Sequence, residues 1–245
     1  MTRLSLVLPA YDEADRLPRA LATYLAWLPA DAELVIVDDG STDGTSEITD
    51  DAAARDPRVR VLRSDHNHGK GYAVRVGILA AAGELIVFTD ADGSYGPPEV
   101  DRVAAALDRA PVAIGVRRAE LAAGRLVRRT ASKVFNLAMR AVLGLPFDDT
   151  QCGLKGFRRD AAGAVFGRAR LDGFAFDAEA LFLAGRLGLE VVEVPVIADH
   201  QPGSKVRLAV DALRMLTDMR RVRRAAARGV YDAEPALPGK DRQAG

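Results

Sequence analysis

The sequence predicts an α/β fold in which a mostly parallel sheet is flanked by helices. Two observations carry this prediction. Short apolar segments rich in β-branched residues alternate with helical segments over the first half of the chain, and carboxylates follow the ends of several of these segments. Strand–helix alternation with nearly continuous apolar strands is typical of a parallel sheet covered on both faces. With 245 residues, 49% hydrophobic and 28% charged, the chain has a globular composition that suits one large domain.

The expected elements follow one another in regular order. Strands are predicted at 4–8, 34–37, 59–62, 85–89 and 112–116, and helices at 13–28, 44–55, 70–82 and 97–107. Pro97 and Pro98 suit the first turn of a helix, because the N–H that proline lacks needs no partner there. After about residue 118 the alternation stops. From there we expect an amphipathic helix over 126–143, a strand over 191–197 and a long helix over 205–228.

Composition excludes several classes of protein. Cys152 is the only cysteine, so neither a disulfide framework nor a cysteine-rich zinc site is expected, and a cytoplasmic location fits. The N-terminus lacks the apolar core of a signal peptide, and no apolar run approaches the roughly 18 residues of a membrane span. Net charge is zero, and the 14 aromatic residues are not interleaved with basic ones. Nucleic acid is therefore not an expected partner.

Basic residues are concentrated in two segments. Residues 117–140 hold seven Arg or Lys against one acidic residue, and residues 205–228 hold eight against two. Such segregation indicates an anionic partner at these segments. The alternative is that both are ordinary solvated helix faces.

The pair Asp90 and Asp92 follows the apolar run 85–88 directly. Open α/β sheets bind ligands at the carboxyl ends of their strands. Hard oxygen ligands at that edge suit Mg²⁺ or Mn²⁺ holding a diphosphate. The alternative reading is a solvated acidic turn.

Three further loops bring polar residues to the same edge. Pro9, Tyr11 and Glu13 follow the first strand, Asp38 and Asp39 follow the second, and Asp65 with Lys70 follows the third. Glycines flank Lys70 at a helix start and resemble an anion site, although the spacing is not that of a Walker loop. We interpret the two histidines near Asp65 as loop residues. The base, ribose and diphosphate of a nucleotide need donors and acceptors arranged along such an edge.

Together these motifs resemble a known family. The stretches Pro9-Ala10-Tyr11-Asp12-Glu13, Val37-Asp38-Asp39-Gly40-Ser41 and Asp90-Ala91-Asp92 resemble the GT-A fold of family 2 inverting glycosyltransferases. Three other stretches resemble, more narrowly, the dolichyl-phosphate (polyprenyl-phosphate) β-glucosyltransferase and mannosyltransferase group. These are Gly69–Arg75, Asp149-Thr150-Gln151-Cys152-Gly153-Leu154-Lys155, and Phe176-Asp177-Ala178-Glu179 with Gly203-Ser204-Lys205.

The resemblance implies a role for each matching residue. The nucleotide sugar would be held by Pro9, Tyr11, Glu13, Asp38, Asp39, Asp65, Lys70, Asp90, Ala91 and Asp92. Asp90 and Asp92 would also bind the metal, Mg²⁺ or Mn²⁺. The catalytic set would be Asp92, Arg117, Arg129, Gln151 and Lys205. In it Arg117 and Arg129 would face the phosphates of donor and acceptor, Gln151 with Asp149 would line the sugar pocket, and Lys205 would close over the phosphate.

The resemblance also implies the division of the chain. One domain would span 1–228, with a nucleotide-sugar half over about 1–116 and an acceptor half over about 117–228, followed by a flexible tail over 229–245. Two departures from the family pattern affect specificity. Ser94 stands where the mannosyltransferases have a glutamine, which favours UDP-glucose over GDP-mannose as the donor. Many members also carry C-terminal membrane helices, which this sequence lacks.

A polyprenyl phosphate acceptor determines what the enzyme must supply. The second pKa of a phosphomonoester is near 6, so the attacking oxygen is already ionised at pH 7 and needs cations, not a strong base. The expected cations are the metal, Arg117, Arg128 or Arg129, and Lys205. With an alcohol acceptor, Asp149, Asp177 or Glu179 would be the candidate base. The basic segments suit the cytoplasmic surface of an anionic membrane, and we expect 120–143 to lie there. The alternatives are GDP-mannose as donor, a soluble acceptor, or sugar-nucleotide binding without turnover.

Overall fold

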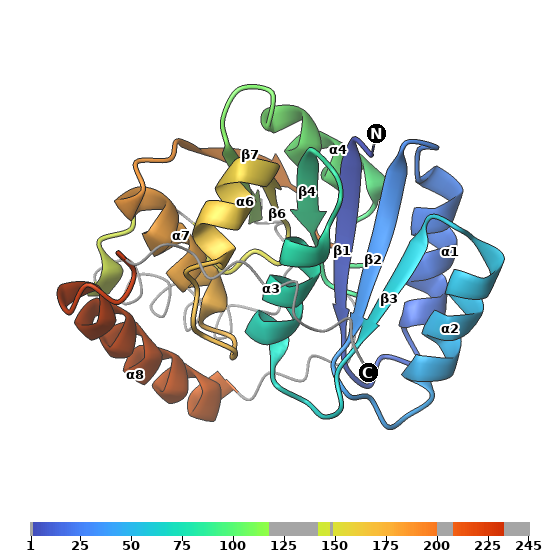
Figure 1. The fold of residues 1–245 in the computed structure, drawn as a ribbon, viewed down its shortest axis with the longest axis horizontal. Helices are drawn as coiled ribbons and strands as arrows, with labels where there is room; N and C mark the ends of the chain where they lie inside the picture. Colours follow the sequence, from blue (N-terminus) through green and yellow to red (C-terminus); the bar gives the residue numbers. More distant parts are fainter. Residues whose placement is uncertain (1, 118–141, 148, 200–207, 233–245) are drawn as a thin grey trace, which may run out of the picture.

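A computed structural model describes residues 2–117, 142–147, 149–199 and 208–232 (Figure 1). Within these residues, seven strands form one sheet in the order β3-β2-β1-β4-β6-β5-β7. Every pairing is parallel except those of β6, which runs antiparallel to β4 and β5. The elements are β1 (Leu4–Ala10), α1 (Leu17–Trp27), β2 (Ala32–Asp38), α2 (Thr45–Arg55), β3 (Val59–Arg63), α3 (Lys70–Ala80), β4 (Leu85–Phe88), α4 (Pro97–Ala106), β5 (Val112–Arg117), β6 (Lys155–Arg158), α6 (Arg159–Phe166), α7 (Phe176–Arg186), β7 (Val191–Val196) and α8 (Leu208–Ala227).

The predicted α/β class and the first five strands are confirmed. The helix predicted to begin at residue 13 begins instead at Leu17. Pro18 occupies its first turn, where its missing N–H costs no hydrogen bond. The preceding residues form a turn in which the Glu13 carbonyl accepts from the backbone N–H groups of Arg16 and Leu17. This turn leaves residues 9–16 at the carboxyl edge of β1, where they can face a ligand.

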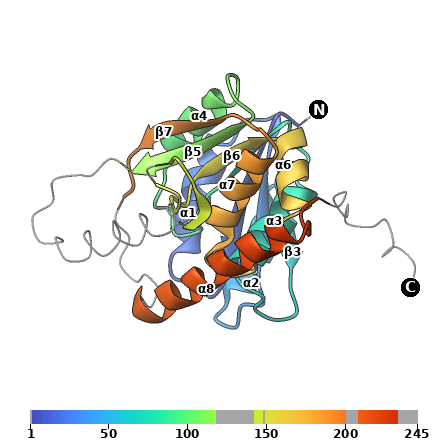
Figure 2. The same ribbon diagram turned by 90° about the vertical axis from the view of Figure 1, so that its left-hand side faces the viewer.

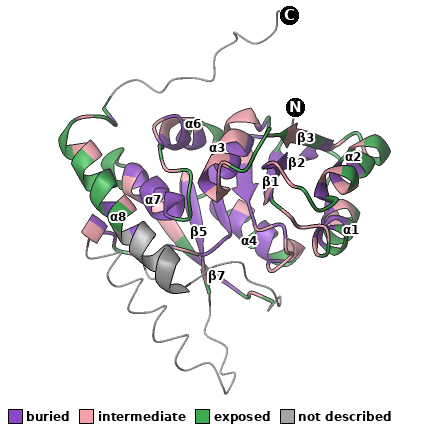
Figure 3. Ribbon diagram, turned by 90° about the horizontal axis from the view of Figure 1, so that it is seen from below, coloured by how far each residue is buried: buried purple, intermediate pink, exposed green. Residues whose placement is uncertain are grey.

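Helices cover both faces of the sheet. One apolar cluster joins α1, α2 and α4 to one face, and a second joins α3, α6, α7 and α8 to the other. The layers are visible from below in Figure 3, where the central strands of the sheet between them are buried. Strands buried on both faces explain why their sequences are continuous apolar runs instead of alternating ones.

Three elements between residues 155 and 186 were not predicted. The strand β6 is only four residues long, Lys-Gly-Phe-Arg, and has a charged residue at each end. Helix α6 follows it directly, and α7 carries Asp177 and Glu179 in its first turn, both buried. Buried charges erase the hydrophobic period from which such elements are recognised. Asp177 can be buried because it pairs with Lys155, and Glu179 because it accepts a hydrogen bond from Tyr231.

Helix α8 begins in the structure at Leu208, and it lies against the outer side of α7 (Figure 2). Met215, Met219 and Val222 face the core. Most of the predicted helix 126–143, and residues 205–207, lie outside the described residues. No helix within the described ranges is both long and apolar enough to cross a bilayer.

The expected tail from residue 229 requires a correction at its start. Tyr231 is only 4% exposed, and its hydroxyl donates to Glu179 Oε1 at 2.6 Å. The same carboxylate accepts from the backbone N–H groups of Arg170 and Leu171. Residues 229–232 are therefore packed against α7, because they satisfy a buried charge that the sequence alone does not reveal.

Replacing Tyr231 with Phe should destabilise the fold in a pH-dependent way. Burial raises the pKa of the Glu179 carboxyl, and loss of the Tyr231 donor raises it further. A hydrogen bond to a charged group contributes about 2 kcal/mol. We expect a loss of this size at pH 7 that shrinks as the pH falls toward the folded-state pKa, because the protonated carboxyl needs the donor less. Urea unfolding at several pH values measures it.

The neighbouring Val230 provides the control. Its side chain is 43% exposed, so Val230→Ala should change the free energy of unfolding by less than about 0.5 kcal/mol at every pH. A Tyr231→Phe protein as stable as the parent at pH 7 would contradict the assigned role.

Candidate functional site

A cavity of about 390 Å³ opens at the carboxyl edge of the sheet, where β1 lies between β2 and β4. The strand order reverses at β1 and β4, which is where open α/β sheets bind ligands. Of the ten residues predicted to hold a nucleotide sugar, eight line the cavity: Pro9, Tyr11, Glu13, Asp39, Lys70, Asp90, Ala91 and Asp92. The structure therefore brings the ends of β1, β2 and β4 and the start of α3 around one space.

Asp39 is buried directly after β2; two backbone amides bind its Oδ2, and His68 Nδ1 lies 3.5 Å from its Oδ1. Its Oδ2 accepts from the backbone N–H groups of His68 and Gly69, at 3.0 and 2.7 Å. Its Oδ1 is buried without a hydrogen bond among the described residues. The nearby His68 Nδ1 is engaged with the carbonyl of His66 at 2.8 Å. Asp39 thus offers one acceptor toward a ligand.

Gly40 brings the β2 loop and the 64–69 loop into backbone contact. Its φ is +72°, and an added Cβ would lie 2.4 Å from the carbonyl carbon of His66. Only glycine allows this approach together with this dihedral. The approach places the His68 and Gly69 amides where they can bind Asp39.

Asp90 and Asp92 both line the cavity, and Asp90 has two different neighbours. Lys70 Nζ lies 2.5 Å from Asp90 Oδ1. On the other side, Gly153 packs so closely that an added Cβ would lie 2.2 Å from Asp90 Oδ2. Asp92 Oδ1 accepts from the backbone N–H of Ser94 at 2.9 Å, which fixes the carboxylate. Two hard carboxylates at a cavity wall fit Mg²⁺ or Mn²⁺, which take such oxygens together with waters and substrate phosphates.

Beneath Lys70 lies a second, fully buried ion pair. Lys155 Nζ contacts Asp177 Oδ1 at 2.6 Å and donates to the Cys152 carbonyl at 2.5 Å. Burial raises the pKa of the Asp177 carboxyl, against the opposing charges of Lys155 and Lys70. Burial likewise disfavours the charged form of Lys70, but Asp90 and Asp177 outweigh it and raise the Lys70 pKa. Sequence reasoning offered Asp177 as a candidate base and missed the role of Lys155, because a lysine in a four-residue strand carries no signal of burial.

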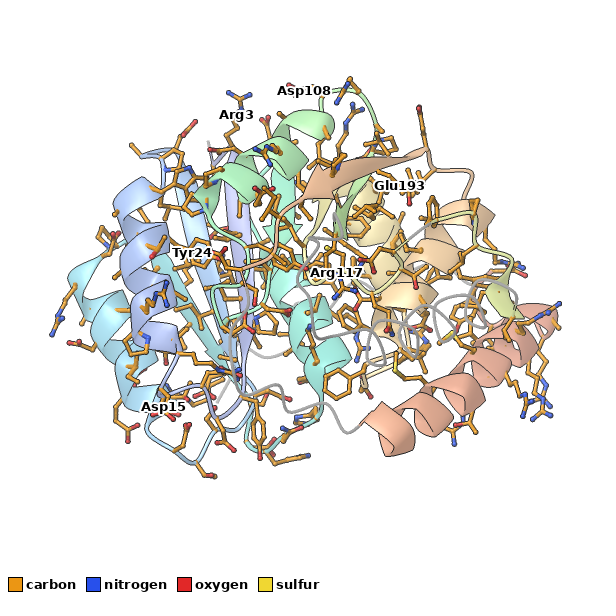
Figure 4. The ribbon with its side chains drawn as sticks, turned by 180° about the vertical axis from the view of Figure 1, so that it is seen from behind. Arg3, Asp15, Tyr24, Asp108, Arg117 and Glu193 are labelled. Atoms are coloured by element: carbon orange, nitrogen blue, oxygen red, sulfur yellow. The ribbon has the colours of Figure 1, made fainter. Side chains whose placement is uncertain are left out.

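Arg117, at the end of β5, forms a bidentate pair with Asp149. Its Nε and one terminal nitrogen donate to the two carboxylate oxygens at 2.7 and 3.0 Å, in the middle of the molecule (Figure 4). Burial opposes ionisation of Asp149, but Arg117 outweighs it and holds the pKa of that carboxyl below its usual range. Gln151 donates its backbone N–H to Asp149 and contacts Met215. The 149–153 loop is thus tied to β5 at one end and touches Asp90 through Gly153 at the other.

Several predicted site residues lie elsewhere. Asp38 is buried behind the cavity, where it accepts from the Ser41 N–H, the Ser46 hydroxyl and Arg63. Asp65 is 82% exposed and pairs with His66 at 2.8 Å, outside the residues that line the cavity. Arg129 and Lys205 lie outside the described residues.

The structure adds lining residues that sequence reasoning missed. Arg16, Asn67 and Phe174 border the cavity, and the Phe174 side chain is 39% exposed there. Arg16 forms an ion pair with Glu13, three residues earlier, at 2.5 Å. The separation of three residues between these opposite charges is the sequence feature that could have indicated the position of Arg16. Phe174 comes from the α6–α7 connection, which reaches the cavity because Asp172 accepts backbone hydrogen bonds from Gly71 and Tyr72 in α3.

The chain is similar to known proteins over most of its length. The family described as Glycosyl transferase family 2 matches residues 5–166. Dolichyl-phosphate beta-glucosyltransferase of Saccharomyces cerevisiae is 32% identical over 256 residues, covering 93% of this chain and 76% of the yeast protein. The protein of the same name from Drosophila melanogaster is 35% identical over 243 residues, covering 88% and 73%.

Solved structures show the same fold. Glucosyl-3-phosphoglycerate synthase from Mycobacterium tuberculosis, in complex with Mn²⁺, uridine-diphosphate-glucose and phosphoglyceric acid, superposes with a TM-score of 0.70. The two sequences are 20% identical, and the match covers 90% of this chain and 79% of the synthase. The predicted GT-A architecture is therefore confirmed.

Replacing Gly153 with Ala should weaken metal binding with little effect on folding. The new Cβ cannot share space with Asp90 Oδ2, so the Asp90 carboxylate must leave its present position in the cavity wall. Loss of a contact that positions a metal-coordinating side chain typically lowers metal affinity 10- to 100-fold. We expect Mn²⁺ binding, measured by electron paramagnetic resonance, to fall by about tenfold or more.

Gly163→Ala is the matched control, because a Cβ at this α6 position meets nothing within 4 Å. It should leave Mn²⁺ affinity unchanged and slightly stabilise the helix. Equal Mn²⁺ affinity in the Gly153→Ala protein would show that the Asp90–Gly153 contact is not required.

Proposed function

We propose that this chain, which belongs to glycosyl transferase family 2, moves glucose from UDP-glucose onto a polyprenyl or dolichyl phosphate. The transfer would invert the configuration at the anomeric carbon. The observation that carries the proposal is the convergence of Asp39, Lys70, Asp90 and Asp92 on one cavity. The names of relatives that are at least 30% identical over most of the chain support the acceptor and the sugar.

UDP-glucose fits the hydrogen-bond acceptors and the charged side chains around the cavity. Asp39 Oδ1 has an unused lone pair for the N–H of a uracil ring, and Oδ2 is held by two amides. Asp90 and Asp92 would hold Mg²⁺ or Mn²⁺, which when bound neutralises the diphosphate and assists its departure. Ser94 binds Asp92 through its backbone N–H. The mannosyltransferases of the family carry a glutamine at this position, so the serine favours UDP-glucose over GDP-mannose as the donor.

Transfer to a phosphate acceptor requires cations to bring two anions together, and it does not require a base to deprotonate the acceptor. The acceptor phosphate oxygen is ionised at pH 7 and attacks the anomeric carbon. As the new carbon–oxygen bond forms, the bond from that carbon to the β-phosphate oxygen breaks, and its electron pair leaves with UDP. Buried carboxylates near the site are committed elsewhere: Asp149 to Arg117, Asp177 to Lys155, and Glu179 to Tyr231. This favours an acceptor that arrives already ionised.

The outer face of α8 suits an anionic membrane surface. Arg220 and Arg224 on α8 and Arg228 directly after it are exposed and four residues apart, and the opposite side of the helix packs on α7. Each basic residue near such a surface contributes about 1 kcal/mol. We propose that this face orients the cavity toward lipid-borne acceptors at the cytoplasmic side of the membrane.

Transfer assays test the reaction. The protein is incubated with Mn²⁺, a short polyprenyl phosphate and labelled UDP-glucose, GDP-mannose or UDP-galactose, and the organic phase is counted. We expect label only from UDP-glucose, and a drop of at least 100-fold for Asp92→Asn. Label only from GDP-mannose would overturn the sugar. Transfer to phosphoglyceric acid but not to the lipid would overturn the acceptor.

Charge reversal on α8 tests the membrane face. The triple variant Arg220→Glu, Arg224→Glu, Arg228→Glu should bind vesicles containing phosphatidylglycerol about 100-fold more weakly, and phosphatidylcholine vesicles as before. The control reverses Arg3, Arg55 and Arg109, which are exposed and lie away from α8 (Figure 4 labels Arg3 and the neighbouring Asp108). Equal loss in both triple variants would indicate an effect of net charge alone.

A further inference from the structure

Four charged side chains of alternating sign extend from the cavity into the core. Asp90 at the cavity wall contacts Lys70, the charge of Lys70 interacts with that of Asp177, and Asp177 contacts Lys155. Exposure falls along the series: the side chains of Lys70 and Asp90 are 25% and 30% exposed, whereas those of Asp177 and Lys155 are 7% and 0% exposed. The innermost pair has no access to any ligand, and the mechanism above does not use it.

The inner pair has the contacts that a buried ion pair requires. Lys155 Nζ contacts Asp177 and the Cys152 carbonyl, and it lies 5.7 Å from the Phe88 ring centre. Asp177 occupies the first turn of α7, where the helix dipole favours a negative charge. These contacts offset part of the cost of burying the pair. The Asp177 carboxyl is therefore held in place behind Lys70.

Lys70 and a divalent cation compete for the same carboxylate. Asp90 Oδ1 is 2.5 Å from Lys70 Nζ, and Gly153 packs closely against Oδ2 of the same carboxylate. A cation that approaches Asp90 from the cavity must therefore meet the Lys70 ammonium. Lys70 also lies 6.0 Å from the ring centre of Phe176, at the start of the helix that carries Asp177. Asp177 is the next residue of that helix, its charge also acts on Lys70, and it is the second carboxylate available to Lys70.

We propose that Lys70 acts as an internal cation that occupies Asp90 in the ligand-free enzyme and shifts toward Asp177 when the metal and donor bind, and that the Lys155–Asp177 pair positions it. Asp177 and Lys155 are positioning residues in this scheme, since neither reaches the cavity. Lys155 limits how strongly Asp177 attracts Lys70, so Lys70 can serve either carboxylate. The inference rests on the proposed function for the presence of a metal at Asp90.

The proposal predicts opposite effects on Mn²⁺ binding from two sets of substitutions. Lys70→Met removes the competitor, so Mn²⁺ should bind the donor-free protein about tenfold more tightly, whereas UDP-glucose in the presence of Mn²⁺ should bind more weakly. The double variant Lys155→Met, Asp177→Asn removes the second carboxylate without leaving an unpaired buried charge. Lys70 then has only Asp90, so Mn²⁺ should bind about tenfold more weakly.

A mutant cycle separates this positioning role from a merely structural one. If the inner pair acts through Lys70, then adding Lys155→Met and Asp177→Asn to the Lys70→Met protein should leave Mn²⁺ affinity unchanged. Electron paramagnetic resonance of free Mn²⁺, with and without UDP, measures all four proteins, and thermal unfolding confirms that each is folded. Arg55→Met, which removes an exposed charge on α2, is the control for net charge.

The outcomes distinguish this inference from the proposed function. A Lys70→Met protein that does not bind Mn²⁺ more tightly overturns the inference, as does an effect of the inner pair that persists without Lys70. A wild-type protein that binds no Mn²⁺ with or without UDP also overturns it. If the cycle behaves as expected but no lipid-linked sugar forms from any donor, the inference stands and the proposed reaction fails.

Discussion

The contact between Asp90 and Lys70 is the interaction on which the site depends. It joins the end of β4 to the start of α3, and Gly153 adds the 149–153 loop on the other side of the same carboxylate. Three segments far apart in the sequence are thereby fixed around one group. A cation accompanies this carboxylate from the start, and this lowers the cost of placing its charge in a partly closed cavity.

Partners also compensate the charges of three other buried carboxylates, one in the cavity wall and two behind it. Asp39 is held by two amides, Asp149 by Arg117, and Asp177 by Lys155. Charges are therefore compensated before any ligand arrives, and the groups are held in fixed positions. A metal complex of a sugar diphosphate carries little net charge, so it can enter such a site without leaving an uncompensated charge behind. Preorganised charges of this kind need no rearrangement of solvent during reaction.

Much of this arrangement follows from the sequence, because apolar strands end in acidic loops at intervals that only a parallel sheet brings together. Asp39, Asp90 and Asp92 were identified in this way. Asp38 was identified by the same pattern, yet it faces Ser46 and Arg63, since successive residues after a strand point in different directions. No local pattern predicted the burial of Lys155 or Tyr231, because their positions depend on partners, Asp177 and Glu179, that lie 22 and 52 residues away. Sequence patterns predict helices and strands from the spacing of nearby residues, and contacts between residues so far apart leave no such spacing.

The first turn of α7 connects the two halves of the molecule. Asp177 faces the charges beneath the cavity, and two residues later Glu179 binds the 170–171 backbone and Tyr231 at the end of the described chain. Tyr231 follows α8 closely, and α8 packs on α7, so the arginine face of α8 has a fixed orientation relative to Lys70. If α8 meets a membrane, the distance and direction from the lipid surface to the anomeric carbon are set through this one helix. Under the proposed function, the buried Glu179 would then act through placement, because an acceptor anchored in a bilayer can reach the donor only from a defined direction.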